Sequence, residues 1–155
     1  MSQLMRREFF FGLFLALCGA VGLTASMALS VEKIEKLTSP DAGLSCDFSV
    51  LVQCSANLES AQGAAFGVPN PFLGLVGFAL VVCVGVALWA VPHFARWFWM
   101  LFNIGVAGAF AFVVWLIGQS IYVLGTLCPW CLVVWLATLP LFFIVTVRNL
   151  SLIHI

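Results

Sequence analysis

The chain has 155 residues, of which 64% are hydrophobic and 8% are charged, and its formal net charge is zero. The charged share is about a third of the ~25% typical of soluble domains. This composition predicts a single membrane domain over residues 1–155, surrounded by membrane lipid. It argues against nucleic-acid binding, because no basic patch is present to neutralise phosphates.

The first apolar segment is an uncharged stretch over about residues 9–31, which follows Arg6 and Arg7. A membrane-spanning helix needs roughly 20 apolar residues, so we expect the first span here. Small residues at every fourth position predict a flat stripe for helix packing: Gly12, Ala16, Ala20, Thr24 and Ala28. A cleaved signal peptide is the alternative, but the apolar run exceeds the usual ~7–15 residues of such a segment.

Residues 32–70 form the only sizeable polar segment, and this segment carries Cys46 and Cys54. Ser39-Pro40-Asp41 within it predicts a helix start. In a straight helix the separation from Cys46 to Cys54 would be roughly 12 Å, whereas a disulfide needs Cα atoms within about 7 Å. If these two cysteines pair, the segment between them must bend or move.

The second predicted span covers about residues 72–91. Residues 97–147 contain no charged side chain, and as one helix they would exceed ~70 Å, against a hydrocarbon core of ~30 Å. This run is therefore predicted to form two spans, about 98–120 and 128–147, joined by a turn near 121–127. Pro140 predicts a kink in the last span.

Four spans place both chain termini on the same side of the membrane. The positive-inside rule makes this side cytoplasmic, because it collects four arginines: Arg6, Arg7, Arg96 and Arg148. The polar loop then faces the periplasm, where disulfides form and persist. The sequence thus predicts an all-α, four-helix bundle in the bacterial inner membrane, with a periplasmic loop carrying a cysteine pair.

The motif Cys128-Pro129-Trp130-Cys131 opens the last predicted span. Two cysteines three residues apart at a helix start lie close enough to form a disulfide without strain, and Pro129 suits the first helical turn. A helix N-terminus lowers the pKa of a nearby thiol, and the thiolate is the form that attacks a disulfide. The motif therefore predicts a redox-active pair on the same face as the cysteines of the loop.

Two cysteine pairs on one face indicate an electron relay by thiol–disulfide exchange. A relay that ends inside an apolar bundle needs a lipid-soluble two-electron acceptor, and a quinone has these properties. A quinone site needs an apolar, aromatic cavity with a few hydrogen-bond donors. The candidates near the same face are Asn70, Gln119, Tyr122, Trp130 and Trp135.

Each of these five side chains also has a structural interpretation. Tyr122 and Trp130 can belong to the interfacial aromatic belt, and Gln119 can join helices by hydrogen bonds. Trp135 can simply pack in the bundle. Asn70 can cap the second span.

The motifs, their order and the predicted topology resemble the vitamin K epoxide reductase family, in its bacterial form without a fused thioredoxin-like domain. The resemblance extends over about residues 9–148. It rests on Cys46-Asp47 with Cys54, on the CxxC motif that opens the fourth span, and on the segment that opens the second, Pro69-Asn70-Pro71-Phe72-Leu73-Gly74.

The resemblance implies a quinone-dependent thiol oxidoreductase that supports disulfide formation in secreted proteins. Cys46 would face a periplasmic thioredoxin-fold thiol oxidase of the DsbA type. Cys54 would exchange with Cys128, and Cys131 would face a ubiquinone or menaquinone drawn from the quinone pool.

Asn70 would match the quinone-binding asparagine of the family. Many relatives have Tyr four residues after the second cysteine of the CxxC motif, where this chain has Trp135. An indole donates one hydrogen bond but does not reproduce a phenol. The second contact to a quinone therefore differs from that of those relatives.

Two rival functions are considered. A DsbB-type oxidase has the same chemistry, but its CxxC motif lies in the first outer loop. A non-enzymatic membrane subunit would use the four cysteines in structural disulfides or in a thiolate metal site, whereas the enzyme interpretation requires no metal. Cys18 and Cys83, which lie in the middle of predicted spans, are interpreted as inert hydrophobic residues.

Overall fold

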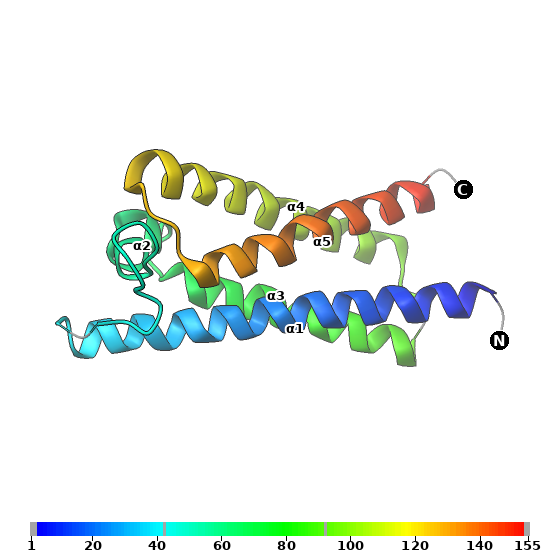
Figure 1. Cartoon of the computed structure of the whole chain (residues 1–155). Helices are drawn as coiled ribbons and strands as arrows, with labels where there is room; N and C mark the ends of the chain where they lie inside the picture. Colours follow the sequence, from blue (N-terminus) through cyan, green and yellow to red (C-terminus); the bar gives the residue numbers. More distant parts are fainter. Residues whose placement is uncertain (1–2, 42, 92, 154–155) are drawn as a thin grey trace.

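The computed structural model describes residues 3–41, 43–91 and 93–153 (Figure 1). Four long helices run up and down in a bundle: α1 (Gln3–Thr38), α3 (Asn70–Ala90), α4 (Arg96–Gly118) and α5 (Pro129–Ile153). Three short elements lie at one end: α2 (Ser55–Glu59), the 3-10 turn η1 (Ala61–Ala64) and the π-helical η2 (Gln119–Leu124). The four long helices are apolar and long enough to cross a membrane. The predicted all-α, multi-pass membrane fold is confirmed.

The first helix is longer than the span predicted over residues 9–31. It has 36 residues, or about 54 Å at 1.5 Å per residue, so its end projects beyond a ~30 Å hydrocarbon core. The helix start predicted at Ser39-Pro40-Asp41 is wrong, because Ser39 directly follows the end of α1. Pro40 disfavours a helical conformation at Ser39 and thereby helps to end α1 there.

The turn between the last two spans is shorter than predicted. The π-helical segment η2 continues α4 as far as Leu124, and Gly125 then turns the chain with a φ of 64°. This left-handed conformation costs glycine little. At the other side of the turn, α5 runs through Pro140 to Ile153; the kink at Pro140 stays a prediction.

The most extensive helix contact is between α1 and α3. The buried side of α1 follows spacings of three and four residues: Gly12, Leu15, Gly19, Gly22, Ser26 and Leu29. This pattern stays on one side of a helix, whereas a strict four-residue repeat drifts by about 40° at each step. The predicted stripe is therefore wrong in its middle, where Ala20 and Thr24 are exposed.

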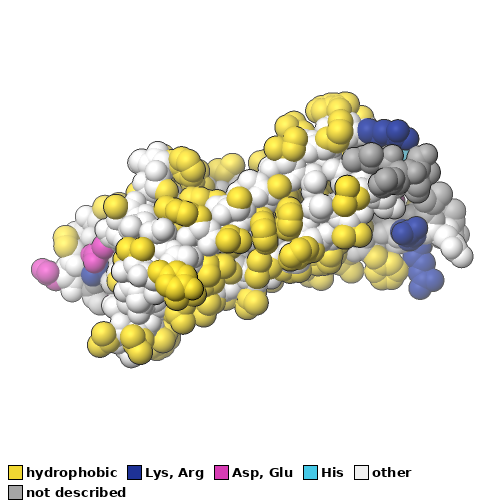
Figure 2. Space-filling model, turned by 90° about the horizontal axis from the view of Figure 1, so that it is seen from above, with side chains coloured by type: hydrophobic (Ala, Val, Ile, Leu, Met, Phe, Trp, Pro, Cys, Tyr) yellow, Lys and Arg dark blue, Asp and Glu magenta, His cyan; other side chains and the backbone are white. Residues whose placement is uncertain are grey.

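Charged side chains lie mainly at the two ends of the bundle, with hydrophobic side chains between them (Figure 2). The end that holds both termini carries arginines, including Arg96 and Arg148. Arg148 pairs with Glu8 there and lies 4.0 Å from the ring centre of Trp99. The opposite end holds α2, and most of the acidic residues lie in or beside the polar loop. This distribution suits a bundle whose middle is surrounded by lipid.

Candidate redox site

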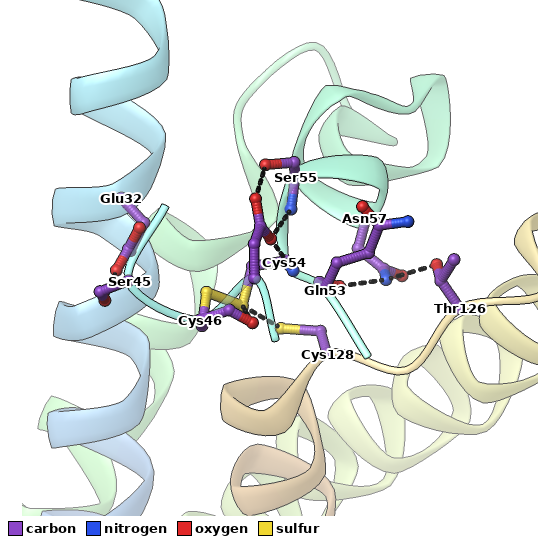
Figure 3. Close-up of a disulfide and its surroundings, with 10 residues drawn as sticks. Glu32, Ser45, Cys46, Gln53, Cys54, Ser55, Asn57, Thr126 and Cys128 are labelled. Carbon is purple, nitrogen blue, oxygen red and sulfur yellow. Dashed lines mark hydrogen bonds between the residues drawn. A yellow bond between two sulfur atoms is a disulfide. The ribbon is translucent and has the colours of Figure 1, made fainter. Parts of the chain in front are cut away.

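The two cysteines of the loop form a disulfide with a Cα–Cα distance of 5.7 Å (Figure 3). The segment between them folds back on itself, because the amides of Phe48 and Ser49 both donate to the carbonyl of Val52, at 3.0 Å each. The bend that pairing of Cys46 and Cys54 requires is therefore present.

A short backbone bridge places this disulfide against the start of α5. The amide of Gln53 donates to the carbonyl of Leu127 at 3.0 Å, and the amide of Leu127 donates to the carbonyl of Leu51 at 2.8 Å. One residue beyond each partner, the sulfur atoms of Cys54 and Cys128 lie 3.1 Å apart. The bridge thus brings the two cysteine pairs into contact.

Three side chains reinforce the same junction. Asn57 on α2 donates from Nδ2 to the hydroxyl of Thr126 at 3.1 Å. The hydroxyl of Ser120 on η2 donates to the carbonyl of Thr126. The sequence indicated a turn near Thr126 but not these contacts, because hydroxyl and amide side chains near a turn are too common to identify a tertiary contact.

Asp47 caps the short helix that follows Cys54. Its Oδ1 accepts hydrogen bonds from the amides of Cys54 and Ser55, at 2.8 and 3.1 Å, and its Oδ2 accepts from the hydroxyl of Ser55. Burial raises the pKa of Asp47, but the hydrogen bonds from Ser55 and Cys54 outweigh it, so the pKa lies below the usual 3.8. The charged carboxylate therefore holds Cys54 in place.

The cap by Asp47 predicts a pH-dependent loosening of α2. Because its folded-state pKa is lowered, the stabilisation is complete above pH 3.8 and is lost as the pH falls through the lower, folded-state value. Hydrogen exchange at the amides of Cys54 and Ser55, corrected for intrinsic rates, is expected to accelerate about fivefold over that step. The variant Asp47→Asn should lack the step; a step that persists in the variant would assign it to another group.

Cys128 immediately precedes α5 and is fully buried. The hydrogen bond from the thiol of Cys131 lowers the pKa of Cys128, and the amides of Cys131 and Trp130 contribute in the same direction. Together they outweigh burial and the negative charge of Asp47, which raise it. Since the thiolate is the reactive form, Cys128 is suited to exchange with the neighbouring Cys54.

A cavity of about 650 Å³ lies within the bundle beside the cysteines. Side chains of α3 and α4 form much of its wall, and these two helices make little direct contact with each other. Most of the lining is apolar. The polar residues and the thiol in the lining are Ser26, Asn57, Ser60, Gln62, Asn70, Gln119, Ser120, Cys131, Trp135 and Thr138.

The structure brings only some of the predicted quinone-binding residues to this cavity. Asn70, Gln119 and Trp135 line it. Tyr122 lies outside the lining with 88% of its surface exposed, as expected for the interfacial aromatic belt. Trp130 is also outside the lining and packs against the cysteines.

Asn70 connects the start of α3 to the turn η1. Its Nδ2 donates to the carbonyl of Gln62 at 2.6 Å, and its Oδ1 accepts from the amide of Ala65 at 3.2 Å. A primary amide has two N–H donors, so these contacts leave one donor for a ligand in the cavity. The predicted cap of α3 by Asn70 is not its role, since Pro69 occupies the capping position.

Comparison with known families identifies the arrangement. A model of the vitamin K epoxide reductase family matches residues 13–146. A search of curated proteins found no match. The matched range includes all four cysteines of the site and most of each long helix. The chain therefore belongs to the vitamin K epoxide reductase family.

Proposed function

We propose that this membrane oxidoreductase moves electrons from an external thiol protein, through its two cysteine pairs, to a quinone. Family membership supports thiol–quinone chemistry in general. The observation that carries the specific path is the 3.1 Å contact between the sulfurs of Cys54 and Cys128. Cys131, three residues after Cys128, lines the cavity. The cysteines therefore form a continuous series from the loop to a ligand site.

The structure holds the loop pair oxidised, whereas Cys128 and Cys131 are free thiols. This state would follow an internal exchange. The Cys54 thiolate attacks Cys128 in the oxidised CxxC motif, and Cys131 leaves as a thiolate. Cys46 then attacks Cys54 and releases Cys128. Two electrons pass to the CxxC pair. The two protons lost by the thiols of Cys46 and Cys54 balance the two protons gained by the thiols of Cys128 and Cys131.

The chemistry of the cavity fits a quinone. Its walls are largely apolar, and Leu73, Leu80 and Leu101 line it from α3 and α4, two helices that make little direct contact with each other. A lipid-soluble ligand could therefore enter sideways from the membrane. A ubiquinone or menaquinone bound here would accept the two electrons and two protons released when the CxxC disulfide closes. Asn70, Gln119 and the indole of Trp135 would supply hydrogen bonds to its carbonyl groups.

The direction across the membrane follows from charge. The arginine-rich end with both termini is assigned to the cytoplasm by the positive-inside rule. The loop disulfide then faces the periplasm, where a thioredoxin-fold oxidase of the DsbA type would deliver electrons. Secreted proteins would be the ultimate source of those electrons.

Filling the cavity is expected to weaken quinone binding without changing the cysteines. Gly105 lines the cavity, and a Cβ atom there would meet nothing within 4 Å. The variant Gly105→Phe should raise the KM for quinone about tenfold or more, because its ring occupies ligand space. Gly118→Phe is the matched control, since Gly118 is equally open but lies outside the lining. Equal KM values in both variants would place the quinone elsewhere.

The proposed function is tested by anaerobic quinone reduction with the purified full chain, followed by quinone absorbance. A reduced DsbA-type protein serves as the donor, and ubiquinone and menaquinone analogues serve as acceptors. Turnover is expected for the wild type and not for the double variant Cys128→Ala/Cys131→Ala. Absence of turnover by folded wild-type protein with every donor and quinone would overturn the proposal, and metal analysis would then test the thiolate-site alternative.

A further inference from the structure

The loop disulfide is oxidised, which is the form in which it would accept electrons from an external thiol, yet both sulfurs are shielded. Cys46 is 3% exposed and Cys54 is 0% exposed. The attacking thiolate must reach a disulfide sulfur. Part of the loop therefore has to move before the partner can react.

The contacts around the loop indicate which part moves. The Cys54 side is fixed to the start of α5 by the backbone bridge through Leu127 and by the bond from Asn57 to Thr126. It is also fixed to α1, because Lys33 donates from Nζ to the carbonyl of Leu58 at 2.6 Å. Movement on this side would separate the two cysteine pairs.

The Cys46 side is held to α1 by a different contact. The hydroxyl of Ser45 donates to Oε1 of Glu32, directly beside Cys46 in the chain (Figure 3). The neighbouring side chains alternate along this segment: Leu44 and Cys46 are buried, whereas Ser45 and Asp47 are exposed. Leu44 adds apolar packing, but the bond from Ser45 is the directional tie of the segment to the helix.

Glu32 is an unusual residue for a contact that only stabilises the fold. It is 6% exposed, and its Oε2 is buried with no hydrogen-bond partner among the described residues. The nearby Lys36 pairs with Glu59, at 3.6 Å, instead of with Glu32. A buried carboxylate oxygen without a partner is unfavourable, so the closed position is held by a contact that carries an energetic cost of its own.

We infer that Glu32 and Ser45 form a latch that controls the access of an external thiol to Cys46. This inference rests on the proposed function, in which the partner attacks this disulfide. With the latch open, residues 43–45 move away from α1 and expose the sulfur of Cys46, while Asp47 keeps its hydrogen bonds to Cys54 and Ser55 and Cys54 remains beside Cys128. Glu32 and Ser45 are positioning residues and take no part in the exchange itself.

The step that the latch permits is a balanced exchange. The thiolate of the partner forms a bond to the sulfur of Cys46, and the Cys46–Cys54 bond breaks. Cys54 leaves as a thiolate with the electron pair of that bond. It is then free beside Cys128, ready for the internal exchange, while the partner is held on the loop by Cys46 until its second thiol releases it.

The test compares how fast reduced glutathione, a small hydrophilic thiol, opens the loop disulfide in the full chain whose Cys128 and Cys131 are reduced. Iodoacetamide stops the reaction, and peptide mass spectrometry reports the alkylation of each cysteine. Ser45→Ala and Glu32→Ala are expected to react on the order of tenfold faster than wild type, the effect of losing one hydrogen bond. Glu35→Ala, at an exposed acidic position on the same helix, should react at the wild-type rate.

Ser45→Ala separates the latch from other effects. Ser45 is exposed, so its loss should leave the fold intact, and the side chain of Glu32 is retained. Unchanged rates in this variant would overturn the latch. So would a parallel rise in alkylation of Cys128 before glutathione is added, since this would indicate general loosening. Quinone turnover by the wild type is measured alongside: a silent wild type overturns the proposed function, whereas an active one with unchanged loop rates in the variants overturns the latch alone.

Discussion

Replacing Cys131 with Ala is expected to abolish quinone reduction and to leave Cys54 and Cys128 joined in a mixed disulfide. Without Cys131, the CxxC pair cannot close, so it cannot release electrons at the cavity. Cys128 still lies 3.1 Å from Cys54, and its thiolate can attack the loop disulfide and free Cys46. The resulting bond has no second CxxC thiol to resolve it, and alkylation of the freed Cys46 prevents the one reverse attack that remains.

The trapped species can be measured by acid quenching, alkylation and mass spectrometry of non-reduced peptides. A Cys54–Cys128 linkage with an alkylated Cys46 is the expected product. Cys128→Ala should lose turnover equally but form no such linkage. Cys18→Ala is the matched control, because Cys18 is a free, half-buried cysteine on α1 outside the cavity lining; it should keep full activity. Full turnover in Cys131→Ala would refute the relay.

The overall architecture could be predicted because lipid imposes strong rules on sequence. Uncharged runs of about 20 residues indicated the four spans, and the charges between them indicated which segments share a side. The extension of α1 beyond residue 31 was missed because most of its residues are polar. A signal was present, since Glu32 and Lys36 are four apart and such pairs favour helix; the structure instead pairs Lys36 with Glu59.

The contact between the two cysteine pairs could be anticipated only by resemblance. It depends on the bridge between Val52 and Leu127, which is an isolated pair in otherwise irregular chain. No alternation of polar and apolar residues marks such a contact. The resting state of the loop pair could not be derived either, because four cysteines on one face allow three complete pairings.

The different placements of Gln119 and Tyr122 have a local cause. Both were predicted to reach the same ligand because they lie near the same face of the membrane, and three residues apart in an α-helix they would lie on neighbouring sides. The segment is instead π-helical, and its wider turn, with hydrogen bonds from residue i to i+5, rotates the second residue further from the first. Gln119 therefore lines the cavity while Tyr122 is exposed.

Replacing Gly85 with Leu is expected to have the largest effect on folding. A Cβ atom at this position would lie 2.7 Å from the backbone nitrogen of Ala16 and 2.8 Å from the backbone oxygen of Gly12. Overpacking costs about 1–3 kcal/mol even where side chains adjust. Backbone atoms of α1 cannot rotate away, so α1 and α3 must separate, and a loss of at least about 3 kcal/mol is expected.

The protein is heated in detergent, and unfolding is monitored as the fraction of protein that remains monodisperse in size-exclusion chromatography. Cys83→Leu, which enlarges an exposed residue on the same helix, should unfold near the wild-type temperature. Equal stability of both variants would show that α1 and α3 do not pack through Gly85.

The milder variant Gly85→Ala connects this packing to function, because α1 contributes Ser26 and α3 contributes Asn70 to the cavity. Separation of the two helices should therefore raise the KM for quinone. Exchange between Cys54 and Cys128 should continue, because the bridge at Leu127 holds these two cysteines together.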